Sequence, residues 1–304
     1  MPPGKIRLVK LALLALASAA PLLAQAPAFR SGVELVTVPV NVTALDGSSR
    51  IDGLTLDEFR LFEDGVLQTL SYARREHPSL SVCVVLDTSG SMRQFGRFAI
   101  AMSAYREIIA NIDPNDEVSV ISSGMHSRIL LPWSAPLRAA GSPLDIKIEN
   151  LTSLNSAISD SVVMALDQIK TATRRDRAIV VVSDGLENAS HVSISSAIRT
   201  RQQSETAIYA FHTAPSRPEG VEVQALPALV GDSGGIVIPV GRREEVNAAV
   251  KRVMDDLRDH YVLAYAPLKA LDGKYRRIKV ESTRDGVQVR HRGGYLALPN
   301  SAGK

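Results

Sequence analysis

Asp87, Ser89 and Ser91 follow a run of aliphatic residues in the stretch VVLDTSGSM, residues 84–92. A continuous apolar run of this kind predicts a buried strand, and here it ends in three oxygen-bearing side chains at alternate positions. This spacing lets one tight loop aim three oxygen donors at a single point, and Gly90 permits the sharp path between the two serines. These side chains are therefore the first candidates for a binding site.

Two further segments supply oxygen donors. Asp184 follows the apolar stretch AIVVVS, residues 178–183, and Ser156 lies just ahead of a predicted helix. In a doubly wound sheet, ligands bind beyond the carboxyl ends of the strands. We therefore expect five side chains to meet at one edge of a sheet: Asp87, Ser89, Ser91, Ser156 and Asp184. Thr152 and Ser153 are alternatives to Ser156, because one sequence does not fix the length of the loop before the helix.

The donor types in this set predict a hard cation. Two carboxylates and three hydroxyls offer oxygen ligands only, without thiolate or imidazole. Magnesium prefers oxygen ligands and keeps several of its waters, so a few protein oxygens suffice. The sequence thus predicts Mg²⁺ at this site, with Mn²⁺ or Ca²⁺ as alternatives. Two acids and neutral hydroxyls leave the ion electrophilic, so an open position would attract a carboxylate from a protein partner.

The segments around these residues predict an α/β domain. Almost continuously apolar runs are typical of strands that are buried on both faces of a parallel sheet, and four occur here, at residues 82–86, 178–182, 207–211 and 236–240. Apolar residues at helical spacing lie between and after these runs, in the segments 98–112, 158–169 and 246–257. Alternation of this sort indicates a doubly wound, mostly parallel sheet, similar to a Rossmann fold.

The flanks of this domain predict antiparallel strands instead. Residues 36–43 alternate valine with other residues, as a half-buried strand does, and Asp-Gly pairs punctuate the later strand-like segments. Each flank has too few strands to bury its apolar face alone. We therefore expect residues 30–78 and 260–298 to build one smaller β-sandwich-like domain, into which the α/β domain, residues 79–259, is inserted.

Residues 1–26 have the layout of a secretory signal peptide. Lys5, Arg7 and Lys10 precede an apolar stretch from Leu11 to Leu23. The whole chain of 304 residues has 35 basic and 32 acidic side chains, and this segment holds three basic and no acidic ones. The mature chain therefore has 35 − 3 = 32 basic against 32 acidic residues. A net charge near zero argues against a nucleic-acid partner, and no transmembrane span is expected in the mature chain.

The site residues resemble those of a known family. VVLDTSGSM followed by VVVSDGLEN is similar to the von Willebrand factor type A domain and its metal-ion-dependent adhesion site, and the resemblance covers roughly Ser79 to Asp259. It implies metal-ligating roles for Asp87, Ser89, Ser91 and Asp184. The third loop of the family normally supplies a threonine, and the aligned position here is Ser156. Serine lacks the methyl group that restricts the rotamer of threonine, which implies weaker or more mobile coordination.

The flanks resemble a narrower group. GLTLDEFRLFEDGVLQTL, residues 53–70, and the segments around 257–298 are similar to the surroundings of this domain in exported bacterial proteins called VWFA-related, which are abundant in acidobacteria. The resemblance implies an exported, metal-binding protein of the periplasm, the cell envelope or the extracellular space.

Three functions follow from these observations. The first is a non-enzymatic, magnesium-dependent module that binds a protein partner through an acidic side chain of that partner. The second is a metal-free structural subunit of an envelope assembly. The third is a hydrolase or phosphatase, against which we count the lack of a Gly-x-Ser-x-Gly elbow, of an Asp-x-Asp nucleophile pair and of a histidine placed by sequence near Ser89. We expect the first.

Overall fold

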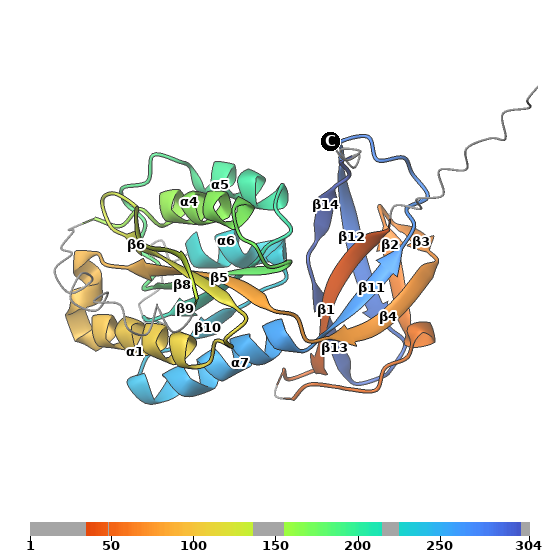
Figure 1. Cartoon of the computed structure of the whole chain (residues 1–304), viewed down its shortest axis with the longest axis horizontal. Coiled ribbons are helices and arrows are strands. Elements are labelled where there is room, and N and C mark those ends of the chain that lie inside the picture. The colour runs from red at the N-terminus through yellow and green to blue at the C-terminus, as the bar shows by residue number, and fades with distance from the viewer. Residues whose placement is uncertain (1–34, 48, 136–154, 215–224, 299–304) are drawn as a thin grey trace, which may run out of the picture. The chain divides into compact units, whose positions relative to one another are not determined.

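A six-stranded sheet forms the centre of the α/β domain in the computed structural model, which describes residues 35–47, 49–135, 155–214 and 225–298 (Figure 1). The strand order is β10-β9-β8-β5-β6-β7, and only the β6–β7 pair is antiparallel. The predicted mostly parallel sheet is thus confirmed. The strands are β5 (Leu80–Asp87), β6 (Glu117–Ser123), β7 (Arg128–Ser134), β8 (Asp176–Ser183), β9 (Ala207–His212) and β10 (Val237–Pro239).

Helices cover both faces of this sheet (Figure 1). On one face lie α1 (Arg97–Ala110) and α7 (Val246–Arg258), and on the other α4 (Ile158–Lys170), α5 (Ile194–Gln202) and α6 (Ala225–Val230). All eight residues of β5 are buried. Because side chains alternate along a strand, Val82, Val84 and Leu86 pack with α1 and α7, whereas Cys83 and Val85 pack with α4 and α6. Each such side chain stabilises the fold by about 1.5–3 kcal/mol.

Two four-stranded antiparallel sheets lie in the flanks, and strands from both ends of the chain build each of them. Their orders are β13-β1-β11-β4 and β14-β12-β2-β3. β1 pairs with β11 and β13, and β2 pairs with β12. The predicted fold class, with a smaller β domain built from both flanks, is confirmed, whereas the domain boundaries stay predictions. The strands are β1 (Val36–Ala44), β2 (Phe59–Glu63), β3 (Val66–Gln68), β4 (Leu70–Glu76), β11 (His260–Tyr265), β12 (Tyr275–Ser282), β13 (Val287–His291) and β14 (Gly294–Leu296).

Side chains from both flanks form the core of the β domain, so neither flank could bury its apolar face alone. Val38 and Val40 of β1 face Leu263 and Tyr261 of β11 across the sheet, and all four side chains are buried. A buried carboxylate adds a polar connection, because Glu63 Oε2 accepts hydrogen bonds from the hydroxyls of Tyr265, at 2.8 Å, and Tyr295, at 2.9 Å. Short helical turns complete the described elements: η1 (Leu56–Glu58), η2 (Gly90–Gly96), η3 (Gly231–Ser233) and η4 (Arg243–Glu245).

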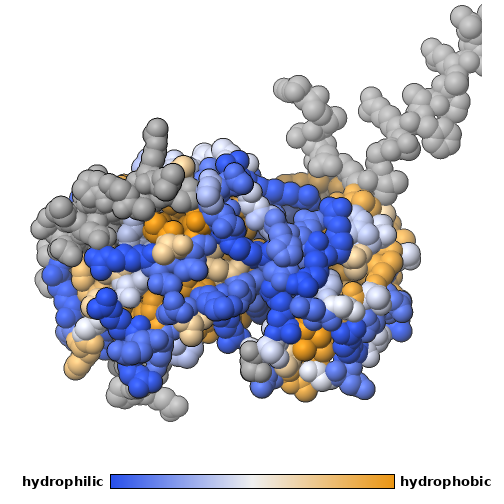
Figure 2. Space-filling view, turned by 60° about the horizontal axis from the view of Figure 1, so that its bottom comes forward, coloured by the Kyte–Doolittle hydropathy of each residue, from blue (hydrophilic) through white to orange (hydrophobic). Residues whose placement is uncertain are grey.

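One face of the molecule is mostly polar. Hydrophilic side chains cover most of the face shown in Figure 2, and hydrophobic side chains form separate, smaller patches. Within the residues that the structure describes, no helix has the length and apolar character needed to cross a membrane. The predicted signal peptide, residues 1–26, lies outside the described residues.

Candidate functional site

The predicted site residues lie at the edge of the sheet where the parallel strands end. Asp87 is the last residue of β5, and Asp184 directly follows the neighbouring parallel strand β8. Ser156 lies two residues before α4, as the helical spacing predicted, while Thr152 and Ser153 lie outside the described residues. Ser156 is therefore the candidate whose position the structure describes.

Asp87 is the centre of a hydrogen-bonded cluster. Its side chain is buried, at 1% exposure, and Oδ1 accepts from the backbone N–H of Ser89 at 2.9 Å. Its Oδ2 accepts from the hydroxyl of Ser183 at 2.5 Å and from that of Ser156 at 3.3 Å. The hydroxyls of Ser89 and Ser91 are 3.1 Å apart. Four of the five predicted residues are thus joined by direct contacts.

Asp184, the fifth, is fully buried beside an arginine that the sequence analysis did not single out. Asp184 Oδ2 accepts from Nη1 of Arg97 at 3.0 Å, and the same nitrogen lies 3.2 Å from the backbone oxygen of Ser91. Asp184 Oδ1 accepts from the N–H of Leu186 at 3.2 Å, and Nε2 of His212 lies 3.2 Å from the backbone oxygen of Asp184. The side chain of Arg97 is only 11% exposed, so its charge acts inside the site.

The loop after β8 holds the loop before α4 in place. Asn188 Oδ1 accepts from the N–H of Ser156 at 2.8 Å, and the backbone oxygen of Ser156 accepts from the N–H groups of Asn188 and Ala189. Glu187 Oε2 accepts from the N–H of Ser159 at 2.8 Å. These bonds fix the position of the Ser156 hydroxyl toward Asp87. The described residues contain no cluster of three or more His, Cys, Asp or Glu side chains that could hold a metal ion; the present set combines two carboxylates with hydroxyls.

An exposed aromatic ring lies next to the site. Phe95, in η2, is 85% exposed and has a φ of 54°, a backbone conformation that is strained for an aromatic residue. The guanidinium carbon of Arg97 lies 5.1 Å from the centre of its ring. Phe95 and Asp184 therefore share one cation.

The environment of Asp87 affects its ionisation. Burial raises the pKa of Asp87 from 3.8 to about 6, although the hydrogen bonds from Ser183 and Ser89 oppose the shift. The folded metal-free protein therefore holds this proton more tightly than the unfolded chain. The stability that the proton provides is fully present below about pH 3.8 and is lost as the pH rises through about 6.

This shift predicts a pH effect on the metal-free protein. Relative to the variant Asp87→Asn, the wild type should lose about 1.4 kcal/mol of unfolding free energy between pH 5 and pH 8. Urea unfolding of both proteins in the presence of a chelator measures this difference, and the comparison cancels the titration of all other groups. An equal pH dependence of the two proteins would contradict the burial argument.

One serine motif lies away from this cluster. Residues 231–235, GDSGG, match the pattern Gly-x-Ser-x-Gly of hydrolases, so the sequence contains a motif that we expected to be absent. In those enzymes the serine lies on a turn from a strand to a helix, whereas Ser233 lies in η3, between α6 and β10. Its hydroxyl accepts from the N–H of Ile208 at 3.0 Å and lies 3.3 Å from the oxygen of Ile208. A Cβ atom on Gly235 would lie 1.9 Å from that same oxygen. The motif thus joins η3 to β9.

The geometry agrees with the family that the sequence resembles: oxygen donors gathered at the carboxyl edge of a doubly wound sheet. Residues 82–187 match the family model of the von Willebrand factor type A domain. All five predicted site residues lie within this type A match. No match was found among curated proteins.

The comparison with solved structures gives matches of low sequence identity. A von Willebrand factor type A protein from Catenulispora acidiphila is 11% identical, with a TM-score of 0.49, over 79% of this chain and 73% of that one. An aerotolerance-related membrane protein from Bacteroides fragilis is 19% identical, with a TM-score of 0.47, over 59% and 98%. The manganese-loaded TRAP protein of Plasmodium vivax is 11% identical, with a TM-score of 0.45, over 75% and 99%. All three TM-scores lie below 0.5, so the function proposed below rests on the site.

Proposed function

We propose that this protein is an exported, non-enzymatic module that binds a protein partner through a divalent cation, Mg²⁺ by preference. The observation that carries the proposal is the environment of Asp87. Its carboxylate is buried and receives hydrogen bonds only from hydroxyls and a backbone N–H, and it forms no ion pair with any described residue. A buried carboxylate is costly unless a cation neutralises it.

The residues present fit such a cation. Asp87, Ser89, Ser91 and Ser156 would hold it directly or through its waters, and Asp184 adds a second carboxylate at the same edge. Ser183 and Asn188 orient this set, because one donates to Asp87 and the other accepts from Ser156. When bound, the ion supplies an electrophilic position for an acidic side chain of the partner. Mn²⁺ or Ca²⁺ would use the same oxygen donors.

A magnesium titration with matched variants tests the metal part of this proposal. Ser156→Ala should weaken Mg²⁺ binding by about tenfold, because it removes a hydroxyl that lies 3.3 Å from Asp87 Oδ2. Ser159→Ala is the control, because its buried hydroxyl lies three residues further on and has no hydrogen-bond partner among the described residues. Calorimetry should show a change for the first variant only. Absence of Mg²⁺, Mn²⁺ and Ca²⁺ binding to the folded wild type would reject the metal site.

Recovery of a partner tests the second part. The purified protein should retain the same envelope protein in Mg²⁺ and release it when a chelator is added. Replacing acidic residues of that partner one at a time should identify the carboxylate that binds. The same preparation should show no esterase or phosphatase turnover, and steady turnover that depends on Asp87 would favour a hydrolase instead.

A metal-free structural subunit is the second candidate, and Arg97 favours it. The guanidinium already supplies a cation to Asp184, so one of the two carboxylates is neutralised within the chain. The two candidates differ in one respect: a metal-free subunit would retain its partner in the presence of chelator.

A further inference from the structure

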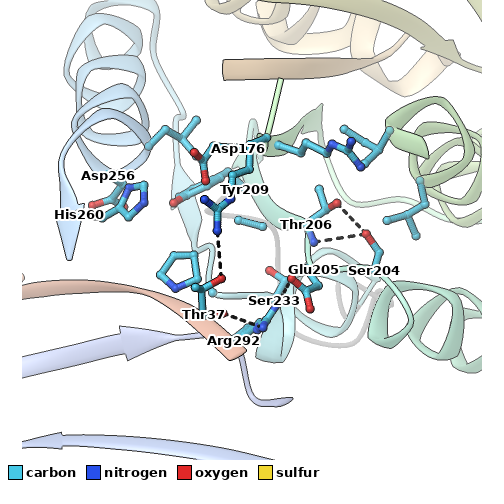
Figure 3. Close-up of a pocket in the computed structure, with 18 of the residues that line it drawn as sticks. Thr37, Asp176, Ser204, Glu205, Thr206, Tyr209, Ser233, Asp256, His260 and Arg292 are labelled. Carbon is cyan, nitrogen blue, oxygen red and sulfur yellow. Dashed lines mark hydrogen bonds and ion pairs between the residues drawn. The ribbon is translucent and has the colours of Figure 1, made fainter. Parts of the chain in front are cut away.

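A cavity lies at the edge of the six-stranded sheet opposite to the Asp87 site, where the strands begin. It has a volume of about 450 Å³ and is lined by β1, the starts of β8 and β9, and the junction of α7 with β11 (Figure 3). All described residues belong to one compact unit of the chain. The cavity shares no lining residue with the site around Asp87.

Two buried acceptor atoms in this cavity have no hydrogen-bond partner in the described part of the chain: Asn41 Oδ1, on a side chain 8% exposed, and His260 Nε2, on one 5% exposed. His260 is hydrogen-bonded to the backbone of Leu257, and since Nε2 is unpaired, Nδ1 makes this bond. We assign the neutral tautomer with the proton on Nδ1, in which Nε2 is an acceptor. Burial lowers the pKa of His260, which favours this neutral form.

Asp176 adds a charge to these two acceptors. Its carboxylate, which lines the cavity, forms no hydrogen bond or ion pair with any described residue. Burial raises the pKa of Asp176, and the side chains of His260 and Arg175 lie within electrostatic range of its carboxylate. Three other lining charges form ion pairs: Glu205 pairs with Arg292 at 2.7 Å, Asp256 with Arg290, and Lys170 with Asp167 at 2.6 Å. Two lining arginines bond to neutral oxygens instead. Nη2 of Arg175 lies 3.5 Å from Oγ1 of Thr37, and Arg177 donates to backbone oxygens. Asp176 is thus the lining carboxylate that lacks a paired cation.

The remaining lining residues indicate what kind of ligand would fit the cavity. Leu166, Ile169 and Leu257 are buried aliphatic side chains that line the cavity. Two neutral acceptors and one carboxylate therefore face a space with an aliphatic wall, and Figure 3 shows Asp176 and His260 directed toward it. The volume exceeds that of a single ion. We propose that this cavity binds a primary ammonium compound with a short aliphatic chain, whose N–H groups donate to Asp176, Asn41 and His260.

This assignment predicts opposite effects on stability and binding. A partly buried carboxylate without a hydrogen bond destabilises the ligand-free protein, so Asp176→Asn should raise its melting temperature. The same change removes the ionic partner of the ammonium group and should weaken binding at least tenfold. Asn41→Leu should also weaken binding, because it removes one acceptor at similar volume. Asp285→Asn is the control, because it removes one negative charge at an exposed position that does not line the cavity, and it should leave binding unchanged.

The test is calorimetric titration of the full chain with n-butylammonium and 1,4-diaminobutane, with tetramethylammonium as a probe that carries charge but no N–H donor. We expect the first two to bind and tetramethylammonium to bind at least tenfold more weakly. Equal binding of all three, equal binding to Asp176→Asn, or no binding of either amine would overturn the proposal and leave a cavity that holds water. If Zn²⁺ displaced the amine and bound more tightly than it, the cavity would be a metal site and the proposal of an ammonium ligand would be wrong.

Discussion

Replacing Asp87 with asparagine is expected to reduce Mg²⁺ affinity at least about 100-fold, since groups one step removed from a metal already change affinity by 10–100-fold. The fold should survive, because asparagine has the same size and its amide oxygen still accepts from the N–H of Ser89. The hydroxyls of Ser183 and Ser156 can rotate to accept from the amide nitrogen. Calorimetric titration with Mg²⁺ and circular dichroism measure the two effects.

The control for this variant is Asp167→Asn, which makes the same charge change on the exposed surface of α4. It should bind Mg²⁺ as the wild type does. The partner recovered in Mg²⁺ should be lost with Asp87→Asn and kept with Asp167→Asn. A folded Asp87→Asn protein with unchanged magnesium affinity would remove Asp87 from the site and with it the proposed function.

Replacing Arg97 with glutamine is expected to lower the stability of the metal-free protein and to raise its affinity for Mg²⁺. Without metal, the variant should lose about 3 kcal/mol of unfolding free energy, because the fully buried carboxylate of Asp184 loses its charged partner. Mg²⁺ should then bind more tightly than in the wild type, by at least roughly tenfold, because charges a few ångströms apart in a protein interact by several kcal/mol. Thermal unfolding with chelator and with excess Mg²⁺ measures both effects.

Arg93→Gln is the matched control, because Arg93 is exposed and lies four residues before Arg97 in the same segment. It should change neither the metal-free stability nor the affinity by a comparable amount. Arg97→Lys keeps the charge and should lie between wild type and Arg97→Gln. A folded Arg97→Gln protein with unchanged or weaker magnesium binding would show that Arg97 does not compete with the metal, and a wild type that binds no metal would favour the structural subunit.

These outcomes separate the two proposals. Loss of magnesium binding with Asp87→Asn concerns the carboxyl edge of the sheet, whereas amine binding depends on Asp176 at the other edge. Each result stands without the other, because the two sites share no lining residue.

The sequence alone determined the fold class and the position of most site residues. The run before Asp87 is apolar over its whole length, so it had to be buried on both faces, and a parallel sheet with two helical layers is the structure that buries it. The end of that run then placed Asp87, Ser89 and Ser91 at the carboxyl edge. The helical spacing after Ile158 placed Ser156 before a helix.

The tertiary structure alone decided which side chains meet. Arg97 and Asp184 lie 87 positions apart, and an arginine at the start of a helix is usually solvated, so no sequence pattern pairs them. Ser183 looked like the end of a strand, yet its hydroxyl contacts Asp87. Asp176, at the start of β8, would pass for a surface charge, and the packing of His260 beside it made it part of a cavity. Periodicity reports which residues are buried, but side-chain partners depend on how distant segments pack.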